Sequence, residues 1–108
     1  MHRFEALEVA LELVKALVPL IAKVGRHSKA EAAQLDDAGN SAVRNLAEGR
    51  RRLGKDRGFY WSVAAGSADE VQWSLRLSIA KGWLAEDESA RALDLDDRLL
   101  AMTWRLTH

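Results

Sequence analysis

Four stretches of the chain carry apolar residues spaced three and four apart, the period at which side chains share one face of an α-helix. The expected helices cover about 4–24, 29–53, 55–81 and 86–108. Gly25, Gly54 and Gly82 are expected to end the first three helices, and Ser28 with Glu31 has the spacing of a capping box. Because short connections join antiparallel neighbours, the pattern predicts an all-α protein: an antiparallel up-and-down four-helix bundle, one domain over 1–108.

The first helix has two apolar stripes instead of one. The first stripe comprises Phe4, Leu7, Leu11, Val14, Val18 and Ile21, and the second comprises Ala6, Ala10, Leu13, Leu17, Leu20 and Val24. A surface helix of a monomeric bundle needs apolar residues over only part of its circumference. The extra stripe indicates either a central helix that contacts all its neighbours or, as the favoured interpretation, a subunit interface. Pro19 is expected to kink or fray this helix.

The second and third helices each have one row with helical spacing that we expect to face the core. The rows are Leu35, Ala38, Ala42, Asn45 and Gly49, and Phe59, Val63, Gly66, Glu70, Trp73, Leu77, Ala80 and Leu84. Trp61 falls off its row and is expected at the surface or in an oligomer contact, since tryptophan is enriched at interfaces. Gly39, between Ala38 and Ala42, predicts the close approach of a neighbouring helix.

Polar residues interrupt these two rows at a similar height in the bundle. If the helices turn near Gly54, Asn45 lies level with positions 64–67, and a buried polar group must be hydrogen-bonded. The predicted structural network comprises Asn45, Glu48, Ser67 and Glu70. The alternative, a paired-carboxylate active site, is disfavoured because no histidine lies near in sequence and no Glu-x-x-His is present. No catalytic residue is therefore predicted.

The composition limits the remaining chemistry. The 108 residues include 16 basic and 16 acidic side chains and no cysteine, so there is no global field for nucleic acid or membrane and no thiolate site. His2, His27 and His108 have no ligand spacing, and we expect neither metal nor cofactor. The start of the chain does not read as a signal peptide, and no stretch reaches the roughly 20 apolar residues of a membrane span. The expected location is the cytoplasm.

Charge is concentrated near the second interhelical turn. The basic residues there are Arg44, Arg50, Arg51, Arg52, Lys55 and Arg57. Glu48 and Asp56 oppose them, which leaves 6 − 2 = +4, whereas the chain from Glu86 onward carries three basic and six acidic residues, or −3. The cluster is either a phosphate-binding rim, multiplied in an oligomer, or a set of cations that complements a helix C-terminus. The second interpretation is favoured for a single protomer.

Several of these residues carry a resemblance to a known family. They are Asn45-Leu46-Ala47-Glu48-Gly49, Arg52, Ala65-Gly66-Ser67 and Glu70. They resemble paired signatures of the bacterial four-helix-bundle family first noticed as reading frames inside intervening sequences of 23S ribosomal RNA genes, to which accessory proteins of diversity-generating retroelements are similar. The resemblance covers most of the chain, although the first helix lacks the Trp-Gln pair expected near its start. It implies a four-helix bundle, a ring-shaped homo-oligomer that is a pentamer, and no enzymatic activity.

Two functions follow as alternatives. The first is a non-enzymatic, homo-oligomeric adaptor whose Arg-rich turn binds structured RNA or a ribonucleoprotein. The second is a protein-interaction scaffold that binds no nucleic acid. In both, the chain itself is a predicted partner, because the apolar stripes exceed what a 108-residue bundle can bury around one core.

Overall fold

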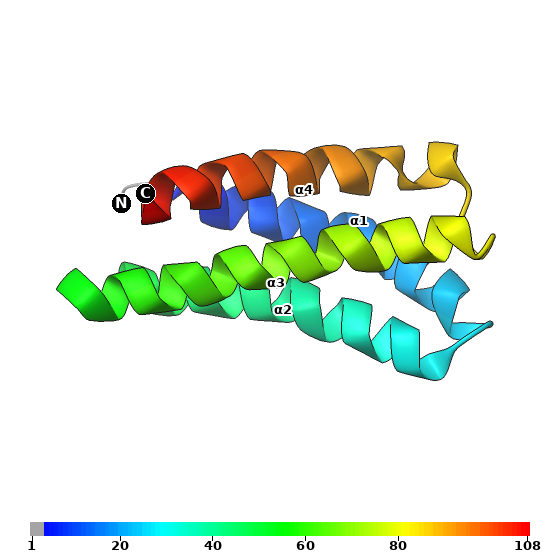
Figure 1. The fold of residues 1–108 in the computed structure, drawn as a ribbon, viewed down its shortest axis with the longest axis horizontal. Helices are drawn as coiled ribbons and strands as arrows, with labels where there is room; N and C mark the ends of the chain where they lie inside the picture. The colour runs from blue at the N-terminus through cyan, green and yellow to red at the C-terminus, as the bar shows by residue number, and fades with distance from the viewer. Residues whose placement is uncertain (1–3) are drawn as a thin grey trace.

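A computed structural model describes residues 4–108 of the chain. Four helices account for nearly all of this part: α1 (Glu5–Gly25), α2 (Lys29–Arg50), α3 (Gly54–Ala80) and α4 (Glu86–Thr107). No strand occurs within 4–108. The helices run up and down as an antiparallel bundle with short connections, as the apolar periodicity predicts (Figure 1).

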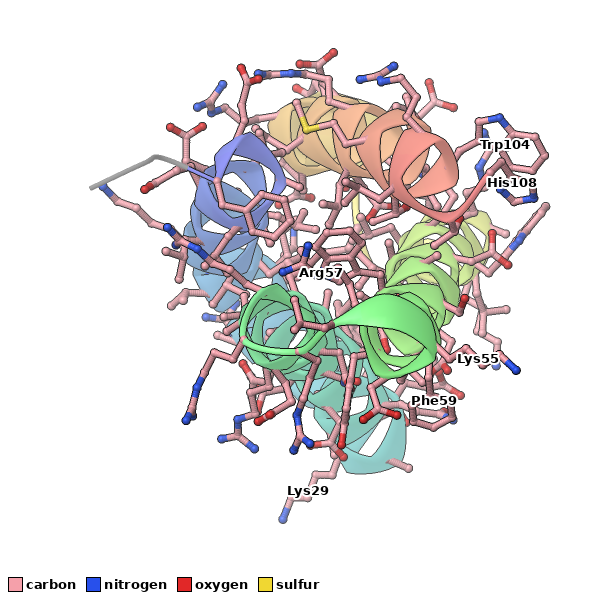
Figure 2. All side chains as sticks on the ribbon, turned by 90° about the vertical axis from the view of Figure 1, so that its left-hand side faces the viewer. Lys29, Lys55, Arg57, Phe59, Trp104 and His108 are labelled. Atoms are coloured by element: carbon pink, nitrogen blue, oxygen red, sulfur yellow. The ribbon has the colours of Figure 1, made fainter. Side chains whose placement is uncertain are left out.

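The bundle is a square of four helices. α1 and α3 each pack against α2 and α4, and α1 and α3 stand at opposite corners when the bundle is viewed end-on (Figure 2). The molecule measures 42 × 24 × 23 Å. The α2–α3 connection lies at the same end as both chain termini (Figure 1). Residues at this end therefore come from four parts of the sequence.

The core is built from one stripe of each helix. On α1 it is the second stripe, since Ala6, Ala10, Leu13, Leu17, Leu20 and Val24 are all buried. The first stripe lies outside, with Leu11 48% and Val18 62% exposed. On α2, Leu35, Ala38 and Ala42 are buried as expected. The two stripes of α1 thus have different environments: the second is buried, whereas the first is partly open to solvent at Leu11 and Val18.

The row predicted to bury α3 is wrong within the helix, and of its members only Leu84, which follows α3, is buried. Its large members face solvent: Phe59 is 63% exposed, Trp73 61% and Leu77 40%, and Glu70 is exposed as well. The buried face is made instead of Ala64, Ser67, Ala68, Val71, Gln72, Leu75 and Ser78. The physical reason is that these small residues allow close helix approach and the polar ones find partners on α2 and α4. Burial here follows fit and hydrogen bonding more than hydrophobicity.

The helix ends agree with the sequence in part. The Glu31 amide donates to Ser28 Oγ at 3.1 Å, so Ser28 caps α2 as predicted. Gly82 has φ +76° and follows α3 as its predicted stop. α2 ends at Arg50, three residues earlier than expected, and Gly54, with φ +58°, opens α3 instead of ending α2. α1 ends at Gly25, as predicted. Gly25 does not have a positive φ, however, so it does not cap the helix in a left-handed conformation.

Two glycines mark close helix approaches. A Cβ added to Gly39 would lie 3.1 Å from Leu17 Cδ1, which confirms the close packing predicted there. A Cβ on Gly49 would lie 2.5 Å from Trp61 Cδ1, because the indole packs directly on that glycine. Trp61 is half-buried, its Nε1 donates to the Leu46 carbonyl at 3.3 Å, and its ring centroid is 5.5 Å from that of Phe4. Trp61 therefore packs within the bundle instead of lying at the surface, and its alternative role in an oligomer contact stays a prediction.

Candidate nucleic-acid interface

The predicted basic residues gather where α2 meets α3. Arg50 ends α2, residues 51–53 form the connection, and α3 begins at Gly54, so Lys55 stands on its first turn. Arg50, Arg51 and Lys55 are exposed, and Figure 2 shows Lys55 pointing away from the bundle at this end. Arg44 is also exposed, but six residues before the end of α2, or about 9 Å along the helix.

Arg57 points inward across this end of the bundle (Figure 2). Its Nε donates to the Gly49 carbonyl at 3.1 Å and its Nη2 to the Arg50 carbonyl at 3.0 Å. Its guanidinium also lies over the Trp61 ring, 5.1 Å from the centroid. Carbonyls in the last turn of a helix lack intrahelical donors, and a cation there complements the macrodipole. Arg57 therefore closes the C-terminus of α2, the second of the two roles considered for the cluster.

Arg52 is held on the surface of the turn. Its Nε donates to Glu48 Oε2 at 2.8 Å, and its guanidinium lies 5.3 Å from the Tyr60 ring centroid. Glu48 therefore forms an ion pair with Arg52 of the basic turn. An aromatic ring stands beside the basic residues although none interrupts them in sequence.

The predicted polar network is centred on a residue that the sequence reasoning missed. Ser41 Oγ lies 2.7 Å from Ser67 Oγ, and Asn45 Nδ2 donates to the Ser41 carbonyl at 2.9 Å and to Ser41 Oγ at 3.1 Å. Asn45 and Ser67 are therefore joined through Ser41 across the α2–α3 contact. The expectation of a buried Glu70 is wrong, because that side chain is exposed. The available signal for Ser41 was its position one helical turn before Asn45.

A second polar cluster joins α3 to α4 and was not predicted. The Gln72 side-chain amide donates to Asp96 Oδ2 at 2.9 Å and to Asp97 Oδ1 at 3.1 Å, and Arg76 Nε donates to Gln72 Oε1 at 2.9 Å. Asp96 is fully buried, and its Oδ1 has no hydrogen-bond partner. The sequence signal was that Ala92, Asp96 and Leu99 follow helical spacing, which places Asp96 on the inner face of α4.

Burial changes the protonation of this carboxyl group. Desolvation raises the pKa of Asp96 to about 7, against the hydrogen bond from Gln72, which lowers the pKa. The nearby charges of Asp97 and Asp69 raise the pKa further. Asp96 is thus a titratable group inside the α3–α4 contact. Its full burial and its hydrogen bond to Gln72 favour a structural over a catalytic role.

Within residues 4–108 no three histidine, cysteine or acidic side chains stand close enough together to hold a metal ion. His2 lies outside the described residues, and His27 stacks on Trp83 with ring centroids 5.8 Å apart. In the same part of the chain, none of the helices is long and apolar enough to cross a membrane.

The fold can be compared with known proteins, although neither a protein-family model nor a curated protein matches the sequence. Among solved structures, the chain is similar to a protein of unknown function from the S23 ribosomal protein family of Bacteroides thetaiotaomicron. The TM-score is 0.86 at 16% identity, over 94% of this chain and 97% of that one. At this identity the likeness shows a shared four-helix fold.

Proposed function

We propose that this chain is a non-enzymatic, homo-oligomeric adaptor of the bacterial cytoplasm that binds structured RNA, or an RNA-protein complex, through the α2–α3 end of the bundle. The observation that carries the proposal is the exposed basic group Arg50, Arg51, Arg52 and Lys55, gathered within six residues of a chain with no net charge. Phosphate contacts from such residues release counterions and provide sequence-independent affinity.

Two further observations support an RNA partner. The basic side chains stand on a turn held rigid by Arg57, which joins the end of α2 to the start of α3. The similar Bacteroides protein carries a ribosomal family name, and the resemblance to intervening-sequence and retroelement accessory proteins points to RNA as well. Several copies in a ring would bring their turns to one rim and multiply the contacts.

The second candidate is a protein-interaction scaffold. It is favoured by the exposed apolar side chains of α3, since Phe59, Trp73 and Leu77 lie on one side of the helix and are largely open to solvent. Self-association is common to both candidates. The number of copies stays a prediction, with five implied by the resemblance.

The deciding experiment is retention on heparin or bulk RNA as a function of salt. We expect retention at about 50 mM salt that falls steeply as salt rises, because each lost phosphate contact changes the log–log slope by about 0.7–0.9. The double variant Arg51→Gln/Lys55→Gln should lower the slope by about 1–2 for each bound copy.

The matched control removes two charges at the opposite end of the bundle. Arg26 in the α1–α2 connection and Lys29 at the start of α2 are both exposed, so Arg26→Gln/Lys29→Gln makes the same change in net charge away from the basic turn. If both double variants lose the same amount of retention, the binding depends only on the total charge of the protein, and the assigned site is wrong. Flow-through of the unmodified protein at about 50 mM salt would leave the scaffold as the function.

A further inference from the structure

Two rows of mainly apolar side chains are partly exposed on the outside of the bundle. On α1 the row is Leu7, Leu11, Val14, Val18 and Ile21, and on α3 it is Phe59, Val63, Gly66, Glu70, Trp73 and Leu77. In both rows the spacing alternates between four and three residues, as in helices that pack side by side. We call them the α1 face and the α3 face.

Both faces border α2. Val14 of the α1 face lies against Gly39, since a Cβ built there would be 3.5 Å from Val14 Cγ2. The α3 face shares a shallow hollow with α2, where Glu31 and Gln34 line the same space as Trp73. The helices that carry the faces stand at opposite corners of the bundle (Figure 2). The contacts of Val14 and Trp73 with the α2 side show that both faces are inclined toward α2.

The contacts around Gly39 show which positions of α1 and α3 lie at the same level along the bundle axis. On one side it lies against Leu17 of α1. On the other, Ser41, two residues further along α2, contacts Ser67 of α3. Because α2 and α3 are antiparallel, Gly39 and Leu17 stand level with about position 69 of α3.

The single charged member of the α3 face then has a counterpart on α1. Glu70 is exposed within the α3 face, and Lys15 is exposed beside the α1 face. Lys15 lies two residues before Leu17, so it stands level with about position 67 of α3, an offset of three residues or about 4.5 Å along the axis from Glu70. α1 and α3 run in the same direction along the bundle, so the long side chain of Lys15 in a neighbouring copy of the same orientation can reach Glu70 across this offset.

We propose that the α3 face of one copy docks on the α1 face of a second copy, with the two helices parallel and Lys15 of one copy paired with Glu70 of the other. This head-to-tail contact uses two different surfaces, as an interface that builds a ring must. Since both faces are inclined toward α2, successive copies turn in the same sense, which places α2 on the inside of the ring and α4 on the outside. The parallel orientation brings every α2–α3 turn to one rim.

This inference rests on the self-association in the proposed function and names its surfaces; it does not require RNA. Opposite charges across an interface fix register and orientation more than they add affinity. A face whose one charged residue meets an opposite charge on the other face therefore distinguishes this pairing from a contact between two identical α3 faces, where Glu70 would approach a second Glu70.

The test breaks one face in each of two variants. Val18→Glu places a carboxylate on the α1 face, and Trp73→Glu places one on the α3 face. Each variant alone should sediment as a monomer of 12.0 kDa, whereas an equimolar mixture should form a 1:1 complex of twice that mass. The mixture assembles because each variant retains the face that the other has lost, and it stops at two copies.

Every other pattern overturns the proposed contact. A two-fold contact between α3 faces predicts that Val18→Glu still pairs with itself, and a mixture that stays at 12.0 kDa removes any complementary pairing. Variants that retain the mass of the unmodified oligomer leave self-association intact and place it on other surfaces. An unmodified protein that is monomeric at every micromolar concentration overturns both this contact and the self-association in the proposed function.

Two controls separate docking from folding and from general charge. Trp104 is as exposed as Trp73, at 61%, but lies on α4, so Trp104→Glu should assemble as the unmodified protein does. Circular dichroism melts identify any variant that fails to fold. Lys15→Glu and Glu70→Lys should each weaken assembly about 5- to 10-fold, and the two changes combined in one chain should restore it. Loss in the combined variant equal to the sum of both losses would exclude the pair.

Discussion

In a simple amphipathic helix the large apolar side chains are buried and the small or polar ones are exposed. Most positions of α3 show the reverse arrangement. Apart from Val71 and Leu75, the buried face consists of small or polar residues: Ala64, Ser67, Ala68, Gln72 and Ser78. The outward face carries Phe59, Val63, Trp73 and Leu77. A helix in a monomeric bundle normally buries its larger apolar side chains. This contrast is the basis on which we propose a second packing partner for α3 outside the bundle.

Close approach explains how the small face is stable. Ala64 and Ala68 are fully buried, and small residues at these positions let the α3 backbone approach its neighbours. The polar members have partners on both sides, Ser67 with Ser41 of α2 and Gln72 with Asp96 of α4. Satisfied hydrogen bonds remove the penalty of burying these groups. The inner face is therefore specified by fit, while the outer one retains the stronger hydrophobic driving force.

Two leucines on α3 allow the sharpest test of this contrast. Leu75 is fully buried, and Leu77, two residues on, is 40% exposed. Leu75→Ala should lower the free energy of unfolding by about 2–5 kcal/mol, because a cavity remains in the core. Leu77→Ala should cost less than about 1 kcal/mol, because its site is already open to solvent. Urea denaturation in the monomeric Val18→Glu background measures both without a contribution from assembly. Equal costs would mean that the two faces of α3 are assigned wrongly.

Asp96 makes the inner contact of α3 sensitive to pH. Its pKa is about 7 in the folded chain and near 3.8 when exposed, so between these values the folded protein retains a proton that the unfolded protein has lost. The stabilisation that the protonated Asp96 side chain contributes is fully present below about pH 4 and is lost as pH rises through 7. Three pKa units correspond to about 4 kcal/mol of unfolding free energy as an upper value.

The measurement compares urea denaturation curves from pH 4 to pH 8 for the unmodified protein and Asp96→Asn. The variant lacks the ionisable group, so its free energy of unfolding should fall less as pH rises. It should therefore be more stable than the unmodified protein at pH 8. Asp97→Asn is the matched control, because Asp97 accepts from the same Gln72 amide but is exposed. A decline that persists in Asp96→Asn, or disappears in Asp97→Asn, would assign the pH dependence to another group.

The sequence predicted the fold because each helix has at least one clear periodic stripe and short connections leave little choice of topology. It failed on α3 because apolar residues occur on both faces, and hydrophobicity alone selects the row with Phe59 and Trp73 over that with Ala64 and Ala68. A similar ambiguity limited the prediction of the helix ends. Gly54 was read as a stop, but its positive φ serves the start of the next helix.

The candidate site was predictable in its composition but not in its contacts. The basic cluster is visible in the sequence, whereas the inward direction of Arg57 depends on where α2 ends. Asp96 shows the same limit for buried polar groups. Its helical position was available from the sequence, but its burial depends on a partner, Gln72, that belongs to another helix and to a face of α3 read as exposed.

The smallest expected effect compares Asn45 with Glu70, two residues that the sequence placed in one network. Asn45 donates twice to Ser41 at the half-buried edge of the α2–α3 contact, so Asn45→Ala should lower the free energy of unfolding by about 1–2 kcal/mol. Glu70 is exposed on the outward face, so Glu70→Ala should change it by less than about 0.5 kcal/mol. Thermal and urea denaturation of both variants in the Val18→Glu background gives the comparison. A larger loss from Glu70→Ala would place that carboxylate in the core network after all, and remove it from the face that we propose meets Lys15 of a second copy.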